Sequence, residues 1–188
     1  MDWTGIIPLR LGAPRKTRLS SAMAAIERER LADRLFAHVA LTVRTHPRIS
    51  ELIVLSPARP WDSPDIWKPD YGRGLNEELN VLRHELSPRN LLVIHADLPL
   101  IEHSDLSQLM DAAEAAGIAI APDHMEVGTN AVAIRQGHSF TFAFGPGSLA
   151  AHCAAVSGEP RLVLSRGLAH DIDRPVDLIL AMRRPTPN

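Results

Sequence analysis

The unbroken apolar run of segment 90–94, NLLVI, constrains the fold of this 188-residue chain more than any other feature. Strands buried on both faces read as continuous runs of Leu, Val and Ile, and such strands belong to parallel sheets covered by helices. The run is followed at once by His95, Ala96 and Asp97. An acid at the carboxyl end of such a strand lies at the edge where open α/β sheets bind ligands. Asp97 is therefore the first candidate for a functional residue.

Strand-like and helix-like patterns alternate on both sides of this run. Apolar spacings of three and four residues predict helices, and short apolar runs between turn residues predict strands. Gly117 suits a helix C-terminus, and Ser20 or Ser21 and Ser104 suit helix N-caps. The alternation predicts an α/β fold with a mainly parallel, doubly wound sheet. The predicted strands are 4–9, 51–57, 90–97 and 118–122, and the predicted helices are 20–45, 76–86 and 105–116.

Two segments depart from this alternation. Residues 57–74 contain four prolines together with Trp61 and Trp67, which predicts an irregular excursion that serves as a lid or as an oligomer contact. From Thr129 onward, shorter strands and more Gly and Pro predict an added layer over the same sheet rather than a second domain. We therefore expect residues 1–188 to form a single domain, a size that supports a sizeable core.

Composition excludes several classes of function. A net charge of −2 argues against non-specific binding to nucleic acid or to an anionic membrane. The single cysteine, Cys153, cannot form an internal disulfide and suits a reducing compartment. The N-terminal segment MDWTGIIPLR has neither the pattern of a signal peptide nor the length of a membrane span. These features predict a soluble cytoplasmic protein.

The loop between the first strand and the first helix, LRLGAPRKTRLSS, is basic. It carries Arg10, Arg15, Lys16 and Arg18 within nine residues. A strand-to-helix loop directs backbone N–H groups and the positive end of a helix dipole toward one place, where cations would complete a polyphosphate site. The pattern is not that of a Walker loop, and a solvated basic surface loop is the alternative.

Near the C-terminus, the segment AHDIDRPVDL offers a pair of carboxylates. Residues two apart in an extended segment face the same way, so Asp171 and Asp173 could act together with Mg²⁺, which favours carboxylates and substrate phosphates. Asp173, just before Arg174 and Pro175, could instead cap the last helix. Asp97 has its own alternative as a turn residue, because Asp-x-Pro is common in turns.

Two small-residue turns could hold an anion. Gly128, Thr129 and Asn130 precede one apolar run, and Gly145 and Ser148 lie in FGPGSLAAH. Backbone donors, an amide and a hydroxyl suit such a role, although either turn alone could be an ordinary one. The histidines show no zinc-ligand spacing, no serine-hydrolase elbow is present, and Cys153 lies in an Ala-rich helical stretch typical of a core position.

Six segments in the same order resemble the guanylyltransferases of the 2-phospho-L-lactate and phosphoenolpyruvate type, which serve coenzyme F-420 biosynthesis. Each segment alone is a weak signal, but the ordered set is specific and spans about residues 5–178. The six are APRKTRLS, GLNEELN, IHADLPL, VGTNAVAI, FGPGSLAAH and HDIDRPVDL.

The resemblance implies a Rossmann-like nucleotidyltransferase fold of the glycosyltransferase-A type that binds GTP and Mg²⁺. It implies that GMP passes from GTP to 2-phospho-L-lactate, phosphoenolpyruvate or 3-phospho-D-glycerate with release of pyrophosphate, and that a homodimer is possible. Lys16, Arg18 and Asp97 would then be catalytic. The remaining roles are metal binding by Asp97, Asp171 and Asp173, nucleotide binding by Arg15, Lys16, Arg18, Leu75 and Asn76, and acceptor binding by Asn130, Gly145 and Ser148.

Other functions remain as alternatives. Molybdenum-cofactor and sugar-phosphate nucleotidyltransferases would share the fold, but they carry a glycine-rich loop that LRLGAPRKTRLS does not match. A catalytically silent nucleotide-binding module is a second alternative, although it would gain nothing from the acids Asp97, Asp171 and Asp173. For the base, we expect groups near Leu75 and Asn76 to favour guanine over adenine.

Overall fold

We describe the protein from a computed structural model, which covers residues 2–12, 14–60 and 64–182. Its strands are β1 (Trp3–Pro8), β2 (Ile49–Ser56), β3 (Ile66–Pro69), β4 (Asn90–Ile94), β5 (Ile118–Pro122), β6 (Thr129–Ile134) and β7 (Arg161–Leu162). Its α-helices are α1 (Ala25–Arg44), α2 (Leu75–Glu85), α3 (His103–Ala116), α4 (Ser148–Ala154), α5 (Arg166–Ala169) and α6 (Pro175–Met182), and a 3₁₀ helix, η1, spans Thr17–Leu19.

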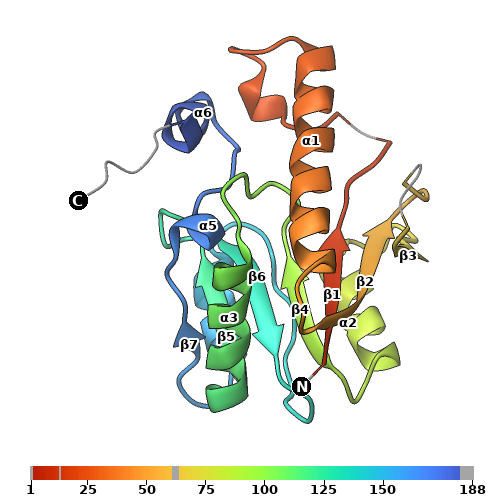
Figure 1. The fold of residues 1–188 in the computed structure, drawn as a ribbon, viewed down its shortest axis with the longest axis vertical. Coiled ribbons are helices and arrows are strands. Elements are labelled where there is room, and N and C mark those ends of the chain that lie inside the picture. The colour runs from red at the N-terminus through yellow and green to blue at the C-terminus, as the bar shows by residue number, and fades with distance from the viewer. Residues whose placement is uncertain (1, 13, 61–63, 183–188) are drawn as a thin grey trace.

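The strands form one sheet in the order β3-β2-β1-β4-β6-β5-β7 (Figure 1). All neighbouring pairs are parallel except those of β6, which runs antiparallel to both β4 and β5. The fold is therefore the mainly parallel α/β sheet with flanking helices that the sequence predicts. The expected added layer is corrected in one respect, because β6 lies inside the sheet. A lone residue pattern cannot show this insertion, since the pairing is non-local.

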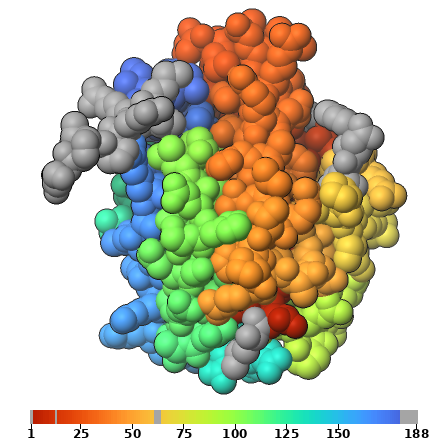
Figure 2. All heavy atoms as spheres, in the orientation of Figure 1, coloured from red at the N-terminus to blue at the C-terminus, as the bar shows by residue number. Residues whose placement is uncertain are grey.

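Two apolar clusters fill the space on the two faces of the sheet. On one face, Val39 and Val43 of α1 and Leu106 and Leu109 of α3 pack against Ile7 and its neighbours. Figure 2 shows this face covered by the atoms of α1 and α3. On the other face, α2, α4 and segment 140–144 pack against residues that include Ile6, Ile53 and Val93. Successive strand residues point to opposite faces, so β1 supplies both clusters.

The predicted strand positions are confirmed, but two helix starts are corrected. Neither Ser20 nor Ser21 caps α1, because the chain first turns through η1, and α1 starts after Ala24, whose N–H donates to the Glu27 carboxylate at 2.8 Å. Ser104 lies inside α3 rather than capping it, and the Asp105 carboxylate accepts from the Glu102 N–H at 2.8 Å. Gly117 ends α3 with φ 89°, as expected for a glycine at this position.

The excursion 57–74 contains a short edge strand that the sequence did not reveal. Strand β3 pairs in parallel with the end of β2, and the indole N–H of Trp67 donates to Ser56 O at 3.1 Å. Trp61 falls outside the described residues, so its predicted role as part of a lid or contact remains a prediction. Among the described helices, none is long and apolar enough to cross a membrane.

Candidate active site

The chain reverses its order of strand addition between β1 and β4. From β1, the chain adds β2 and β3 on one side, and β4 then lies on the other side of β1. Ligands of open α/β sheets bind outside the carboxyl ends of strands at such a switch point. A cavity of about 700 Å³ opens there, lined by residues of the loop after β1, by His95–Asp97 after β4, and by Asp173.

Lys16 stands at the centre of this site. Its ammonium donates to the Asp97 carboxylate in a close contact and to Asp173 Oδ1 at 3.1 Å. The backbone of Lys16 is left-handed, with φ 53°, a conformation that is uncommon for a residue with a Cβ and that recurs at ligand sites. Burial acts to lower the pKa of Lys16, but the charges of Asp97 and Asp173 outweigh it and raise the pKa. Lys16 therefore remains protonated and positively charged.

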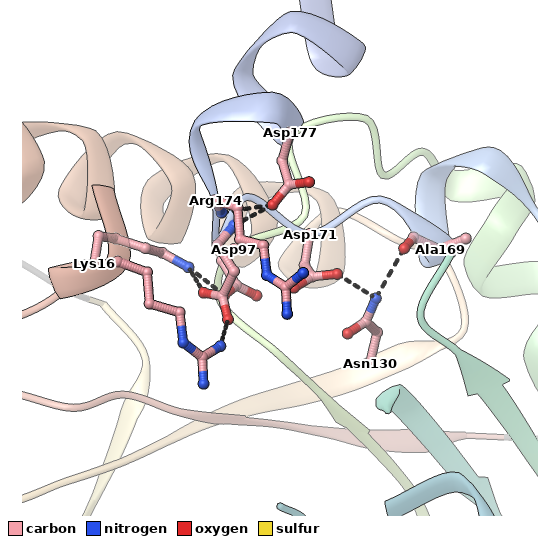
Figure 3. Close-up of polar contacts among 9 residues, drawn as sticks. Lys16, Asp97, Asn130, Ala169, Asp171, Arg174 and Asp177 are labelled. Atoms are coloured by element: carbon pink, nitrogen blue, oxygen red, sulfur yellow. Dashed lines mark hydrogen bonds and ion pairs between the residues drawn. The ribbon is translucent and has the colours of Figure 1, made fainter. Parts of the chain in front are cut away.

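Three carboxylates converge on one point from distant parts of the chain. Ligand atoms of Asp97, Asp171 and Asp173 all lie within 4.8 Å of one another. The Ile172 N–H donates to the backbone oxygen of Asp97 at 3.1 Å, which fixes the extended segment 171–173 against the end of β4. Figure 3 shows Lys16 reaching toward Asp97 from one side and Asn130 reaching Asp171 from the other.

The two acids of the C-terminal pair have opposite electrostatic surroundings. Burial, followed by the charge of Asp97, raises the pKa of Asp171. Burial would also raise the pKa of Asp173, but the charges of Lys16 and Arg18 outweigh it and hold that pKa below its usual value. An added cation would relieve the repulsion between Asp97 and Asp171. Asp171 is therefore the acid of this pair whose negative charge is not compensated by Lys16 and Arg18.

This donor set fits a hard divalent cation. Carboxylate oxygens are the ligands that Mg²⁺ and Mn²⁺ favour. Asp97 Oδ1 is also buried with no hydrogen-bond partner among the described residues, although buried carboxylate oxygens are normally bonded. An ion held by the three acids would supply the missing partner. The ammonium of Lys16 meets part of this demand for positive charge.

Asp173 does not cap the last helix. Its two oxygens bind Lys16 and Arg18, the latter at 2.8 Å. The capping role belongs to Asp177, whose Oδ2 accepts from the backbone N–H groups of Asp173 and Arg174 at 2.9 and 2.6 Å. The alternative interpretation of Asp173 as a helix cap is therefore wrong, and Asp177 holds the segment that carries Asp173.

The basic loop divides its cations between two tasks. Arg15 lines the cavity, but its guanidinium binds Glu29 at 2.7 Å and Asp33 at 2.6 Å, both on α1. Those bonds anchor the loop to the helix. Arg18 is 68% exposed and has Asp173 as its acidic partner, so its remaining donors face solvent. Lys16 and Arg18 are thus the loop cations that contact the acids of the site, and Arg10 also lines the cavity.

Asn130 lies buried at the start of β6 beside the acids. Its amide nitrogen donates to Leu168 O at 2.9 Å, to Ala169 O at 3.2 Å and to Asp171 Oδ1 at 3.3 Å. These bonds orient the Asp171 carboxylate and fix α5 against the sheet. Asn130 does not line the cavity that Lys16 and Asp97 share.

Gly145 and Ser148 belong to one tight turn before α4. The Ser148 N–H donates to Gly145 O at 3.1 Å, and Gly145 has φ 139°, which favours glycine. Gly147 rather than Ser148 occupies the N-cap position of α4. Ser148 is buried. Gly145 and Ser148, like Asn130, do not line the cavity.

Leu75 and Asn76 begin α2 beside the cavity, but they differ in what they offer. Leu75 lines the cavity and is 37% exposed. The Asn76 amide binds the backbone of Phe144 at both ends, donating to the oxygen at 2.9 Å and accepting from the N–H at 2.7 Å. Asn76 therefore fixes the segment that leads to Gly145.

Sequence patterns missed His152 and Asp70. His152 is fully buried on α4, where Nε2 accepts from Ala143 N–H at 2.9 Å and Nδ1 lies 3.0 Å from Thr129 Oγ1. Burial, and then His95, lower the pKa of His152 to about 4. No local signal marks it. Asp70 lines the cavity directly after β3, and the same signal that marks Asp97, an acid after a strand, marks it.

Comparison with known sequences gives consistent matches over nearly the whole chain. The sequence model of a family described as guanylyl transferase CofC like matches residues 4–178. A phosphoenolpyruvate guanylyltransferase of Sphaerobacter thermophilus is 35% identical, and the match covers 95% of this chain and 91% of that protein.

Solved structures share the fold at low sequence identity. A protein of Desulfovibrio desulfuricans G20 assigned to the nucleotide-diphospho-sugar transferases superposes with a TM-score of 0.75 at 13% identity, covering 97% of this chain and 87% of that one. The protein Rv0371C of Mycobacterium tuberculosis, solved as a complex with manganese, gives a TM-score of 0.58 at 15% identity and covers 96% and 97%.

Proposed function

The chain belongs to the CofC-like guanylyl transferases, and from this membership we propose that it transfers GMP from GTP to a small phosphorylated acid and releases pyrophosphate. That it is a nucleotidyltransferase follows from the family and from the relatives that carry this name. The nucleotide GTP, the acid and the divalent ion are the proposed parts. Residues 1–188 would act as one domain, because the acids from the end of β4 and from segment 171–173 share one edge of one sheet.

One observation carries the proposal. A lysine whose side chain is only 9% exposed and three carboxylates that lie within 4.8 Å of one another occur together at the switch point of the sheet. A binding module needs donors for phosphates, but it has no use for a cluster of acids that repel them. An enzyme that must neutralise charge as a phosphoanhydride bond breaks needs both a metal site and a cation.

The reaction requires little covalent chemistry from the protein. An oxygen of the acceptor phosphate forms a new bond to the α-phosphorus of GTP, the bond from α-phosphorus to the bridging oxygen breaks, and pyrophosphate leaves with the electron pair. A phosphate monoester is already anionic, so no general base is required. Lys16 and Arg18 would neutralise charge on the departing phosphates, and Asp97, Asp171 and Asp173 would hold Mg²⁺ or Mn²⁺, which polarises the α-phosphate. The manganese bound by Rv0371C supports this choice of ions.

The relatives' name makes phosphoenolpyruvate the first acceptor to test, with 2-phospho-L-lactate and 3-phospho-D-glycerate as the others. Each carries a carboxylate and a phosphate, and each product would be a guanylylated acid for coenzyme F-420 biosynthesis. Asn130, Gly145 and Ser148 are the proposed acceptor residues. Because Asn130 already donates to Asp171 and Gly145 holds the turn before α4, their role would be to position groups that meet the acid.

Mass spectrometry of the product tests the proposal directly. The protein is incubated with GTP, Mg²⁺ and one acid at a time, and pyrophosphate is measured in parallel. We expect a guanylylated acid and an equal amount of pyrophosphate with at least one of the three acids. GTP without acid is the control and should yield neither. Release of phosphate rather than pyrophosphate would contradict the proposal. The absence of a guanylylated product with all three acids would also contradict it.

A further inference from the structure

The cavity has two chemically different ends. Lys16, Arg18, Asp97 and Asp173 line the end that would hold phosphates and metal. The other end is walled mainly by apolar side chains, together with one cation and a single acid. That second set comprises Pro8, Leu9, Leu55, Leu75, the cation Arg10 and the acid Asp70. An apolar slot with one carboxylate suits a flat heterocycle that presents hydrogen-bond donors at its edge.

The sheet sets the separation of the two ends. Asp70 follows β3 and Asp97 follows β4, with β2 and β1 between them. Three strand spacings correspond to about 14 Å. A nucleotide spans a comparable distance from its phosphates to the outer edge of its base. With the phosphates at Lys16, a base that enters the apolar end would meet Asp70.

Hydrogen bonds within the protein hold the turn that carries Asp70. Glu78 of α2 is buried, and its Oε1 accepts from the Tyr71 N–H at 2.8 Å and the Arg73 N–H at 3.2 Å. The Asp70 N–H donates to Ser56 O at 3.0 Å. A carboxylate on a fixed turn needs little reorganisation to bind, which increases the selectivity it can give.

One oxygen of Asp70 is already used and the other remains available. Asp70 Oδ1 accepts from the Gly72 N–H at 2.8 Å, and Oδ2 has no hydrogen-bond partner among the residues that the structure describes. Asn76, which the sequence assigned to the nucleotide, has both ends of its amide bound to Phe144. Asp70 is thus the polar side chain at the apolar end of the cavity with an acceptor to spare.

We propose that Asp70 selects the guanine base, a specificity that rests on the proposed function. Guanine presents two adjacent donors, N1–H and the exocyclic 2-amino group, and an ionised carboxylate accepts from both. Adenine presents an unprotonated N1 there, whose lone pair faces the carboxylate and is repelled. The site then discriminates by a repulsive element as well as an attractive one. Leu75 and Leu55 wall the slot that receives the flat base.

The variant Asp70→Asn tests the assignment by a gain as well as a loss. An asparagine keeps one oxygen for Gly72 N–H but presents an amide nitrogen to the base. That nitrogen would face the guanine 2-amino group, whereas it would donate to the C2 carbonyl of xanthine. We expect GTP binding to weaken at least about tenfold and xanthosine triphosphate binding to strengthen, since one bidentate base contact gives discrimination of this order.

Binding is measured by calorimetry with GTP or xanthosine triphosphate and Mg²⁺, without any acceptor acid. The measurement therefore stands even if no acid is guanylylated, which separates this proposal from the proposed function. Glu77→Gln, at an exposed acid of the same helix start, is the control and should bind GTP like the original protein. Unchanged GTP binding by Asp70→Asn overturns the proposal. Equal weakening for both nucleotides, as a ribose contact would give, also overturns it.

Discussion

Two groups of residues at the same edge of the sheet differ in whether the protein itself already satisfies their polar groups. In the proposed nucleotide half, which comprises Lys16, Arg18, Asp97 and segment 171–173, the charges compensate one another incompletely, and Asp97 Oδ1 is buried with no hydrogen-bond partner among the described residues. In the proposed acceptor half, which comprises Asn130, Gly145, Ser148 and the neighbouring His152, the amide and imidazole side chains hydrogen-bond to the protein itself.

This difference indicates in which half a bound ligand would form hydrogen bonds or ion pairs that the protein alone does not provide. A buried carboxylate oxygen without a partner costs stability in the protein alone, and a ligand that supplies the partner recovers that cost. A satisfied network such as His152 with Thr129 and Ala143 instead stabilises the fold and fixes the shape of the site. Substitutions in the nucleotide half should therefore reduce turnover, and those in the acceptor half should first reduce stability.

The largest effect is expected from Asp97→Asn. The variant keeps the shape of the side chain but removes a charge from the proposed metal site. Loss of one charge-stabilising group in a preorganised site costs about 10²–10³ in turnover. Steady-state pyrophosphate release at saturating Mg²⁺ measures it, and the thermal midpoint should stay within a few degrees.

Asp111→Asn is the matched control for Asp97→Asn, because Asp111 is an exposed acid whose partner is Arg48. It should leave turnover unchanged. Asp171→Asn should behave like Asp97→Asn. Near-normal turnover by either site variant would show that the three acids share no catalytic metal.

The second effect concerns stability against pH in the acceptor half. Burial, followed by His95, lowers the pKa of His152 to about 4 in the folded protein, while an unfolded histidine titrates near 6.5. The unfolded state therefore binds the proton first, and stability that is complete above pH 6.5 is lost as the pH falls toward 4. The loss amounts to about 3 kcal/mol. Urea unfolding at several pH values between 7.5 and 4 measures it.

His152→Gln separates this histidine from the other titrating groups. A glutamine can accept from Ala143 N–H and donate to Thr129 Oγ1 as the neutral imidazole does, but it takes up no proton. The variant should lose less unfolding free energy than the original protein between pH 6.5 and 4, whatever its stability at pH 7.5. Equal losses of unfolding free energy in the two proteins would show that His152 takes up its proton equally well in the folded and unfolded states.

The third effect tests whether Lys16 competes with a metal. Its ammonium binds Asp97 and Asp173, two of the three proposed ligands. Lys16→Met keeps most of the side chain and removes the charge. A unit charge at about 4 Å contributes about 1 kcal/mol or more, so Mn²⁺ alone should bind at least about fivefold more tightly. Electron paramagnetic resonance of free Mn²⁺ measures it, without nucleotide.

Lys68→Met is the control for metal binding, because Lys68 is an exposed lysine whose partner is Glu85. It should bind Mn²⁺ like the original protein. If Lys16→Met also binds Mn²⁺ no better, Lys16 does not compete for the acids. Turnover by Lys16→Met should fall in either case if the ammonium neutralises the departing phosphates.

Sequence patterns predicted the parts of the fold that depend on local information. The apolar runs at 4–9, 51–57, 90–97 and 118–122 each contain a strand, because a strand buried on both faces needs an apolar residue at every position. The insertion of β6 between β4 and β5 was not predictable in this way. Strand β6 pairs with β4, which is distant in sequence, as well as with the preceding β5, and both pairs are antiparallel. An antiparallel strand inside a mainly parallel sheet has the same apolar pattern as its parallel neighbours.

The site was predictable to a similar degree. Asp97, Asp171 and Asp173 were proposed together, and the structure brings their ligand atoms within 4.8 Å. Their role as metal ligands remains a prediction. The partners of Arg15, Asn76 and Asn130 could not be foreseen, because Glu29, Phe144 and Leu168 meet them only after folding. Residue type identifies a donor, but tertiary structure decides whether the protein or a ligand uses it.

The smallest effect tests the acceptor half at Ser148. Gly147 caps α4, so Ser148→Ala should reduce stability by less than the roughly 0.5–2 kcal/mol that loss of a cap costs. If the buried hydroxyl meets the acid, its loss removes one neutral hydrogen bond of about 0.5–1.5 kcal/mol. The KM for the phosphorylated acid should then rise about two- to tenfold while the KM for GTP stays constant. Ser157→Ala, at an exposed serine after α4, is the control and should change neither KM. Unchanged values for both substrates in Ser148→Ala would place the acceptor elsewhere, and the contrast between the two halves would then rest on the nucleotide half alone.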